Sequence, residues 1–327
     1  MTLQIGFVGT GGIARAHQNH LSSLEGVTVA GFTGTRMAHS EKAAREWKDA
    51  RAYESLEQML DDRRLDAVYI CVPPDSHDGL EELLIDRGIP FLVEKPLGTD
   101  LALPRRLAAR IREQNLLTSV GYHWRYLDSA QKAKELLLNT KIGMSLGYWM
   151  GTMPRAPWWI VQKGSGGQFV EQTTHITDLL RYLVGEITEV YAAYSHRVMH
   201  EVVEGADVSD VGTVTMKLAD GSVATISNTC LIPNYHTVGL DIYTNDGIYE
   251  IREACLKRAT ADTVTQYNNQ TKPMYNENEA FIRALRTGDR SGILSDYEDS
   301  LKTHEVTMAA NESARTGLPV TIPGNGA

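Results

Sequence analysis

The sequence predicts an α/β protein in which a doubly wound parallel sheet is followed by an α+β domain with a large, mainly antiparallel open sheet. Two patterns carry this prediction. In the first part of the chain, short buried strands alternate with amphipathic helices, which is typical of a βαβ series. Later strands are longer, alternate between apolar and polar residues and meet at tight turns, as antiparallel strands do. We expect one domain over residues 1–122 and a second over residues 123–327.

The first expected element is the apolar strand Leu3 to Val8, which runs directly into Gly9-Thr10-Gly11-Gly12-Ile13-Ala14 and a helix-like pattern. In such a turn the first glycine permits the sharp bend, and the second leaves room for a phosphate against bare backbone. Ala14 is small enough for helix and strand to pack closely. Free N–H groups and the positive end of the helix dipole then face the anion. Glycine clusters also mark ordinary turns, so the position directly behind a strand is what favours a dinucleotide-binding loop.

The rest of the first domain continues the alternation. Further strands are expected at 27–32, 65–72, 90–93 and 117–121, and helices at 40–47, from 56, from 80 to 88 and at 101–114. Ser40 and Ser55 stand where serine caps begin helices, and Gly88 stands where glycine ends one. Pro73 and Pro74 stop the strand before them.

The second domain is recognised by two hairpins. Strands at 210–218 and 223–231 flank an Asp220-Gly221 turn, and strands at 238–244 and 248–252 flank an Asp246-Gly247 turn. Helices are expected at 130–138, 174–183, 279–286 and 301–315.

Composition excludes several classes of protein. A net charge of -9 argues against nucleic-acid binding and against anionic membranes, since both need a basic face. The three cysteines are widely spaced, so neither a disulfide framework nor a thiolate zinc site is indicated. Neither a leader nor an apolar run of the roughly 18 residues that a membrane span needs is visible. We expect a reduced, cytoplasmic location.

Three polar residues carry the strongest chemical signal. Glu171, His175 and Asp178 are spaced i, i+4 and i+7, which on one helix places them within about 60° of one another. A neutral imidazole can accept a hydroxyl proton, and a nearby carboxylate can hold the ring and stabilise its charged form. A solvated helix face is the alternative. A metal site is a third option, although nothing else in the sequence resembles a ligand set, and we expect no metal.

Other candidate residues follow strands or flank the expected domain boundary. Lys95 ends a parallel strand at the edge where such sheets bind ligands, and its ammonium could stabilise an alkoxide; the alternative is a surface lysine. Tyr122, His123 and Arg125 could line a substrate cleft or pack at the domain junction. Trp158 and Trp159 could form an aromatic wall for a sugar ring or the nicotinamide, or belong to the core or a subunit contact.

The end of the second strand bears on cofactor choice. NAD specificity would require an acid about 20 residues beyond the glycines, and the first carboxylate after this strand is Glu41, which belongs to the next helix. Thr33, Thr35 and Arg36 instead offer two hydroxyls and a guanidinium to a 2′-phosphate. We therefore expect NADP to be preferred over NAD. The alternative is an Arg36 that is solvent-exposed or stacks on adenine without discriminating.

Taken together, these segments resemble the Gfo/Idh/MocA oxidoreductase family over essentially the whole chain. The matching segments are Gly9 to Ala14, Ala67 to His77, Val93 to Leu97, Gly121 to Arg125, Gly166 to Asp178, and Ser313 to Gly317. The resemblance implies a Rossmann domain followed by an α/β domain whose open sheet is often the oligomer interface. We accordingly expect a homodimer or homotetramer.

The resemblance also implies roles for individual residues. Lys95 matches the lysine that contacts the reacting hydroxyl and the nicotinamide ribose of the cofactor. His175 matches the usual proton acceptor, and Asp178 the aspartate one turn later. Glu171 stands where many members carry aspartate, which puts substrate identity in doubt. The cofactor positions implied by the resemblance also include Val72, Pro73, Pro74, His77 and Glu94.

The expected activity is hydride transfer between a nicotinamide cofactor and a secondary alcohol or ketone of a sugar or cyclitol. Two alternatives remain open within the same resemblance: an NAD-dependent glycosidase without net cofactor turnover, and a non-catalytic regulator that senses a dinucleotide or sugar.

Overall fold

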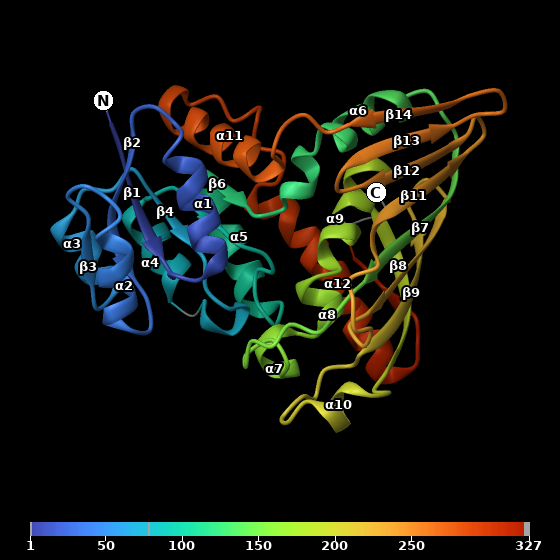
Figure 1. Cartoon of the computed structure of the whole chain (residues 1–327), viewed down its shortest axis with the longest axis horizontal. Helices are drawn as coiled ribbons and strands as arrows, with labels where there is room; N and C mark the ends of the chain where they lie inside the picture. The colour runs from blue at the N-terminus through green and yellow to red at the C-terminus, as the bar shows by residue number, and fades with distance from the viewer. Residues whose placement is uncertain (1, 78, 324–327) are drawn as a thin grey trace. The chain divides into compact units, whose positions relative to one another are not determined.

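The computed structural model describes residues 2–77 and 79–323, and the chain folds into two compact units. The first unit comprises Met1–Leu97, Ala102–His123 and Lys272–Asp299, and the second comprises Gly98–Leu101, Trp124–Thr271 and Ser300–Ala327. Figure 1 shows the elements of both units in chain order.

A parallel six-stranded sheet forms the centre of the first unit, with strand order β3-β2-β1-β4-β5-β6. Its strands are β1 Leu3–Val8, β2 Val27–Thr33, β3 Arg51–Tyr53, β4 Ala67–Ile70, β5 Phe91–Val93 and β6 Thr118–Val120. The order reverses direction between β1 and β4, as a doubly wound sheet requires. The expected fold class is therefore confirmed for this unit, although the short edge strand β3 was not expected.

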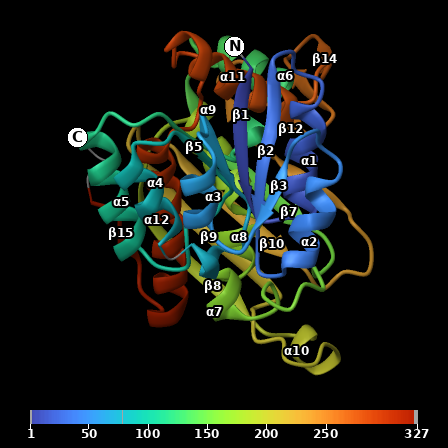
Figure 2. The same cartoon turned by 90° about the vertical axis from the view of Figure 1, so that its left-hand side faces the viewer.

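Helices cover both faces of this sheet, and Figure 2 shows α1 and α2 on one side with α4 and α5 on the other. The helices are α1 Gly12–Leu21, α2 Met37–Ala44, α3 Leu56–Asp62, α4 Leu80–Arg87 and α5 Ala102–Glu113, with the 3-10 turn η1 Pro74–Ser76. A second 3-10 turn, η2 His123–Tyr126, starts at the last residue of the segment Ala102–His123, and its other residues belong to the second unit. Ser55 caps α3 as expected, since its side chain accepts from the Gln58 N–H at 3.2 Å. Ser40 does not cap α2, which begins at Met37 and buries Ser40 within it. That prediction was wrong.

A segment near the C-terminal end of the chain, Lys272–Asp299, belongs to the first unit. Helix α11, Pro273–Thr287, buries its apolar face against this sheet, with Phe281 packed edge-on to Tyr69 at 5.7 Å between ring centroids. The division of the chain therefore differs from an uninterrupted second domain over 123–327. The physical reason is that the inward face of α11 completes the hydrophobic core beside α1.

The second unit is built on a nine-stranded sheet with strand order β14-β13-β12-β11-β7-β10-β9-β8-β15. All neighbouring strands are antiparallel except β7 and β10, so the expected mainly antiparallel sheet is confirmed. Its strands are β7 Ile142–Met150, β8 Ile187–Ser195, β9 Val211–Leu218, β10 Val223–Thr229, β11 Thr237–Thr244, β12 Ile248–Arg252, β13 Cys255–Ala259, β14 Val264–Asn268 and β15 Val320–Thr321. Both expected hairpins form, as β9-β10 and β11-β12.

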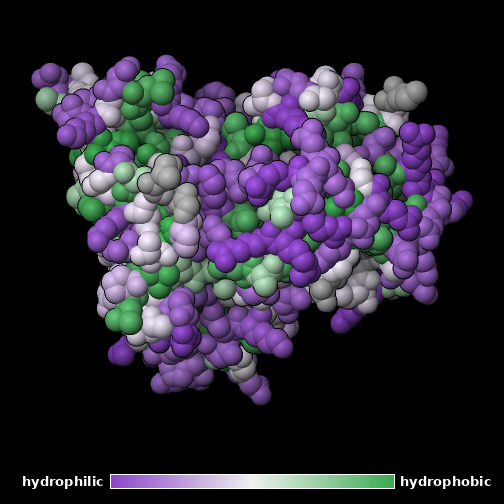
Figure 3. All heavy atoms as spheres, turned by 180° about the vertical axis from the view of Figure 1, so that it is seen from behind, coloured by the Kyte–Doolittle hydropathy of each residue, from purple (hydrophilic) through white to green (hydrophobic). Residues whose placement is uncertain are grey.

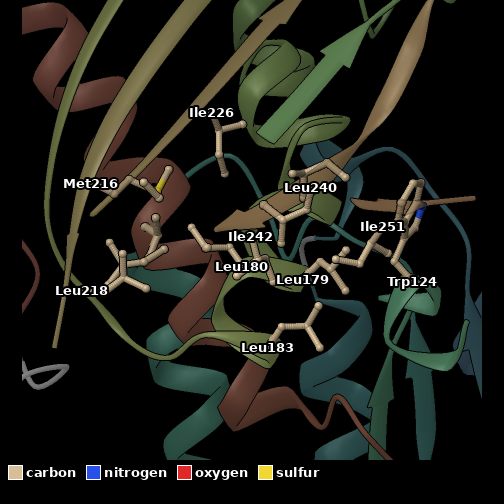
Figure 4. Close-up of a cluster of buried hydrophobic side chains, with 14 of the residues drawn as sticks. Trp124, Leu179, Leu180, Leu183, Met216, Leu218, Ile226, Leu240, Ile242 and Ile251 are labelled. Atoms are coloured by element: carbon tan, nitrogen blue, oxygen red, sulfur yellow. The ribbon is translucent and has the colours of Figure 1, made fainter. Parts of the chain in front are cut away.

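One face of this sheet is covered by helices. The helices after residue 123 are α6 Asp128–Leu137, α7 Gln162–Ser165, α8 Gln168–Glu171, α9 Thr174–Leu183, α10 Met199–Val202 and α12 Tyr297–Thr316, besides α11. Figure 4 shows Leu179 and Leu180 of α9 in the hydrophobic cluster that Ile226, Leu240 and Ile242 of the sheet also form. This cluster is the core of the second unit.

The other face of the sheet carries exposed apolar side chains. Alternate residues of β9 and β10 are exposed or half-buried. Strand register places the exposed Met144, Tyr191, Val223, Ile248 and Val264 on this same face. Seen from behind, the molecular surface shows hydrophobic patches between polar side chains (Figure 3).

Across the described residues, no helix combines the length and the hydropathy needed to cross a bilayer.

Candidate active site

The glycine loop of the first unit has room for a ligand against its backbone. Gly9 has a φ of 98°, and a Cβ added there would lie 2.2 Å from the Cys71 carbonyl oxygen, so only glycine fits. A Cβ added to Gly11 or Gly12 would meet no atom within 4 Å. The loop is thus closed on its inner side at Gly9 and open where a pyrophosphate would approach.

The helix behind the loop presents an uncapped N-terminus. Gly11 is the N-cap residue of α1 and makes no side-chain cap bond, and the first turn holds no acidic residue. Ala14 is fully buried, whereas Ile13 is 37% exposed. Uncapped N–H groups and the positive end of the dipole favour an anion, so these residues fit the phosphates of a dinucleotide.

The end of β2 lies beside this loop. A Cβ built on Gly34 would be 3.9 Å from the Thr10 Oγ1 and 4.0 Å from the Gly9 Cα. Thr33 is buried at the strand end, whereas Thr35 and Arg36 are exposed, and Arg36 directly precedes α2. Two exposed polar side chains, one of them cationic, therefore follow the strand that adjoins the glycine loop.

The segment after β4 holds four of the expected cofactor positions, and two of them are buried. Val72 and Pro73 are half-buried, and Pro74 is buried at the start of η1. His77 is buried, with its Nδ1 2.6 Å from the Glu81 Oε1. Burial by itself lowers the pKa of His77, but the Glu81 carboxylate outweighs it and leaves this pKa raised. The His77 ring is therefore held in an ion pair within the unit.

Glu94 and Lys95 follow β5, and a cis peptide bond joins Lys95 to Pro96. Glu94 is only 5% exposed, and its Oε1 lies 2.8 Å from the Nε2 of the fully buried His17. Burial raises the pKa of Glu94, but the hydrogen bond and charge of His17, with the charge of Lys95, outweigh burial and lower it. The carboxylate is thus an ionised internal partner of His17, while Lys95 remains half-exposed.

Gly121, Tyr122 and His123 follow β6. A Cβ on Gly121 would lie 2.7 Å from the Glu94 carboxylate, so the glycine makes room for that group. Tyr122 is fully buried, which fits the packing alternative better than a side chain lining a cleft. Burial lowers the pKa of His123 to about 4, with Glu94 opposing this shift and Lys95 and His17 adding to it. His123 is therefore neutral near pH 7.

In the second unit, Glu171 and His175 do not share a helix. Helix α8 ends at Glu171 and α9 begins at Thr174, so the single helical face expected for Glu171, His175 and Asp178 was wrong. The N–H of Thr173 donates to the Gln168 carbonyl at 2.9 Å, which closes α8 before the chain turns into α9. His175 and Asp178 remain together on α9.

Glu171 is held by an indole. The Trp159 Nε1–H donates to the Glu171 Oε2 at 2.5 Å, and Trp159 is 2% exposed within a cluster that includes Met153, Val208 and Cys230. The Trp159 indole is therefore part of the core, which is one of the alternatives that the sequence left open. Trp158 packs against the same cluster and is half-buried.

Asp178 and Arg125 form a buried ion pair. The Arg125 Nε and Nη2 donate to the two carboxylate oxygens at 2.7 and 2.6 Å, and the Thr303 hydroxyl donates to the Asp178 Oδ1 at 2.7 Å. Asp178 is fully buried and Arg125 is 4% exposed. The guanidinium thus neutralises an internal carboxylate, which differs from the substrate contact expected for Arg125.

His175 has an aromatic neighbour that the sequence analysis missed. The ring of Trp149 on β7 stacks on the His175 imidazole, with 5.9 Å between centroids and 19° between planes. His175 is 4% exposed. Strand β7 was not expected, because its inner positions include the small residues Ser145 and Gly147, which weaken the alternation of apolar residues that reveals a strand.

Within residues 2–77 and 79–323, no group of three or more His, Cys, Asp or Glu side chains could hold a metal ion.

The chain is similar to proteins of known class. The family model described as "Oxidoreductase family, NAD-binding Rossmann fold" matches residues 3–122, and "GFO/IDH/MocA C-terminal domain" matches residues 131–250. Inositol 2-dehydrogenase of Rhizobium meliloti is 25% identical over 98% of this chain and 100% of the relative. D-xylose 1-dehydrogenase (NADP(+)) 2 of Haloferax volcanii is 24% identical, again over 98% and 100%. The structure of levoglucosan dehydrogenase with NADH and levoglucosan gives a TM-score of 0.88 at 18% identity, covering 99% of this chain and 100% of that one, which shows the shared fold.

Proposed function

The chain belongs to the GFO/IDH/MocA family of NAD(P)-dependent oxidoreductases, and on that premise we propose that it oxidises a secondary alcohol, or reduces the ketone, of a sugar or cyclitol. The open glycine loop at the uncapped N-terminus of α1 is the observation that carries the proposal. Relatives named as inositol and xylose dehydrogenases support the substrate class. A bound nicotinamide dinucleotide would supply the hydride acceptor or donor.

Two side chains are proposed to act on the reacting oxygen. In the oxidation direction the His175 imidazole accepts the hydroxyl proton, and the Lys95 ammonium stabilises the oxygen as negative charge develops. The buried Glu94 carboxylate precedes Lys95, and the attraction of its charge to that of Lys95 contributes to the lowered pKa of Glu94. Glu171, fixed by the Trp159 indole, is the proposed polar contact for a substrate hydroxyl.

Replacing either group tests these roles. Lys95→Ala and His175→Ala are each expected to lower turnover by about 10² or more while dinucleotide binding persists. Arg106→Ala, which removes an exposed cation from α5, is the control and should keep full turnover. Reduction of NAD(P) is followed by absorbance with inositols, aldoses and ketoses as substrates. Near-normal turnover in either variant overturns that residue's role, and binding without net cofactor turnover by the unchanged protein would favour the glycosidase or sensing alternatives.

We further propose that NADP is preferred over NAD. Thr35 and Arg36 are exposed beside the glycine loop, Thr33 ends the strand, and the first carboxylate after them is Glu41. An arginine can bind a 2′-phosphate with directional, charge-assisted hydrogen bonds. Arg36→Ala should lower kcat/KM for NADP about tenfold or more and leave NAD little changed. A preference for NAD in the unchanged protein, or an unchanged preference in Arg36→Ala, would refute the proposal.

The open face of the nine-stranded sheet supports a proposed dimer or tetramer. Tyr191 and Val223 are each 47% exposed there, and Val264 is 66% exposed. Apolar side chains gathered on one sheet face are stabilised when another subunit covers them. Light scattering at micromolar concentration should give the mass of two or four chains, and a stable monomer would contradict the proposal.

A further inference from the structure

The Trp149 indole and the His175 imidazole form a stacked pair with nearly parallel rings. Their centroids are 5.9 Å apart with planes 19° from parallel, and His175 is 4% exposed. Trp149 is half-buried. A flat, electron-rich indole therefore lies beside the imidazole with its plane nearly parallel to that ring.

The backbone explains why the two rings meet. Gly147 lies on the face of β7 that α9 covers, and a Cβ there would be 2.8 Å from the Ile176 Cγ2. A glycine at this position lets α9 approach the strand closely. His175 immediately precedes Ile176, and Trp149 lies two residues beyond Gly147 on the same face, so the close approach brings the rings together.

The neighbouring strands hold the indole in place. Trp149 is in register with Val238 of β11 on one side and Asn228 of β10 on the other. Val238 is 3% exposed and Asn228 is 5% exposed, and the Asn228 amide donates to the Gln168 Oε1 at 2.7 Å. The platform beneath His175 is thus a packed, central part of the sheet.

Asp178, the residue that the sequence suggested would hold the imidazole, has other partners. Its two carboxylate oxygens accept hydrogen bonds from Arg125 and Thr303. We propose that Trp149 is a positioning residue, which fixes the plane of the His175 ring and stabilises the imidazolium formed when that ring takes a proton. An aromatic face attracts a cation, and stacking restricts rotation of the ring. The proposal rests on the proposed function, in which His175 is the proton acceptor.

Kinetics of three variants test the role. Trp149→Leu removes the aromatic face and is expected to lower kcat about 5- to 30-fold, the range that corresponds to a cation–π contact, with KM for the dinucleotide unchanged. Trp149→Phe keeps a flat ring and should recover most of kcat. Trp47→Leu, which removes a half-buried tryptophan from the first unit, controls for general loss of packing and should keep full activity. Equal kcat in Trp149→Leu and the unchanged protein, or an equal loss in Trp149→Phe and Trp149→Leu, would overturn the proposal.

NMR of the imidazole tests the geometry without turnover. With isotope-labelled histidine, the ring-proton resonance that disappears in His175→Gln belongs to His175. The indole ring current should shift this resonance upfield in the unchanged protein and in Trp149→Phe, and the shift should vanish in Trp149→Leu. An unshifted resonance in an active protein overturns the role of Trp149 alone. A shifted resonance in a protein with no turnover on any polyol removes the proposed function, and the role of Trp149 with it.

Discussion

Breaking the buried pair of Arg125 and Asp178 should strongly destabilise the second unit. Asp178→Leu removes an acceptor that receives hydrogen bonds at 2.7 and 2.6 Å from Arg125 and at 2.7 Å from Thr303. The Arg125 guanidinium, 4% exposed, then stays buried without its counter-charge, with the Tyr182 ring 5.1 Å below it. Breaking a buried pair from one side costs about 3–5 kcal/mol. For a unit of this size, that lowers Tm on the order of 10 °C.

A double-mutant cycle separates the loss of a partner from the value of the pair. Arg125→Met together with Asp178→Leu removes both charges and should cost less than Asp178→Leu alone, because no unpaired charge remains. Urea unfolding followed by tryptophan fluorescence measures each free energy of unfolding. Glu312→Ala breaks the exposed ion pair with Arg315 and should show no measurable change. A loss below about 1 kcal/mol for Asp178→Leu, or a larger loss for the double variant, would refute the reasoning.

Three further predictions concern the first unit. Because the pKa of His123 is lowered to about 4, the NMR titration midpoint of its ring should lie near pH 4. The stability that depends on neutral His123 is fully present above about pH 6.5 and is lost as pH falls towards 4. A titration midpoint near pH 6.5 would contradict this prediction. The pKa of Glu94 is lowered, so the contact of its ionised carboxylate with His17 stabilises the fold above about pH 4.5, and this contribution is lost as pH falls through the lowered pKa. The difference in Tm between the unchanged protein and Glu94→Gln should therefore shrink on acidification, and a constant difference would disprove the linkage. Gly11→Val should keep Tm and raise KM for the dinucleotide at least about tenfold, whereas Gly9→Ala should fail to fold normally; equal effects of the two would contradict the assigned geometry.

The features that could be predicted from sequence are those set by neighbouring residues. The strand Leu3–Val8 has the bounds expected from its apolar run, and the Ser55 cap and the Gly88 terminus of α4 occur where short-range rules place them. The residues expected in the dinucleotide loop fold into an open loop at a helix N-terminus, since strand, glycines and helix are consecutive in the chain.

Sites assembled from distant segments were harder to predict. The spacing of Glu171, His175 and Asp178 suggested one helix, but Gln172 and Thr173 interrupt it, and the pattern of side chains does not reveal that break. From sequence alone, Trp159 could have lined a ligand site or belonged to the core. The burial of its indole depends on Met153, Val208 and Cys230, which lie far apart in sequence.

The sequence by itself determined the alternation of strands and helices, the glycine loop and the presence of Lys95 and His175 at the ends of elements, because each depends on short-range sterics and periodicity. Only the tertiary structure decided which partners these residues have. The return of α11 to the first sheet, the pairing of Asp178 with Arg125 and the stacking of Trp149 on His175 each join segments more than 25 residues apart. Such contacts depend on how whole faces pack, and packing is a property of the folded chain rather than of any local pattern.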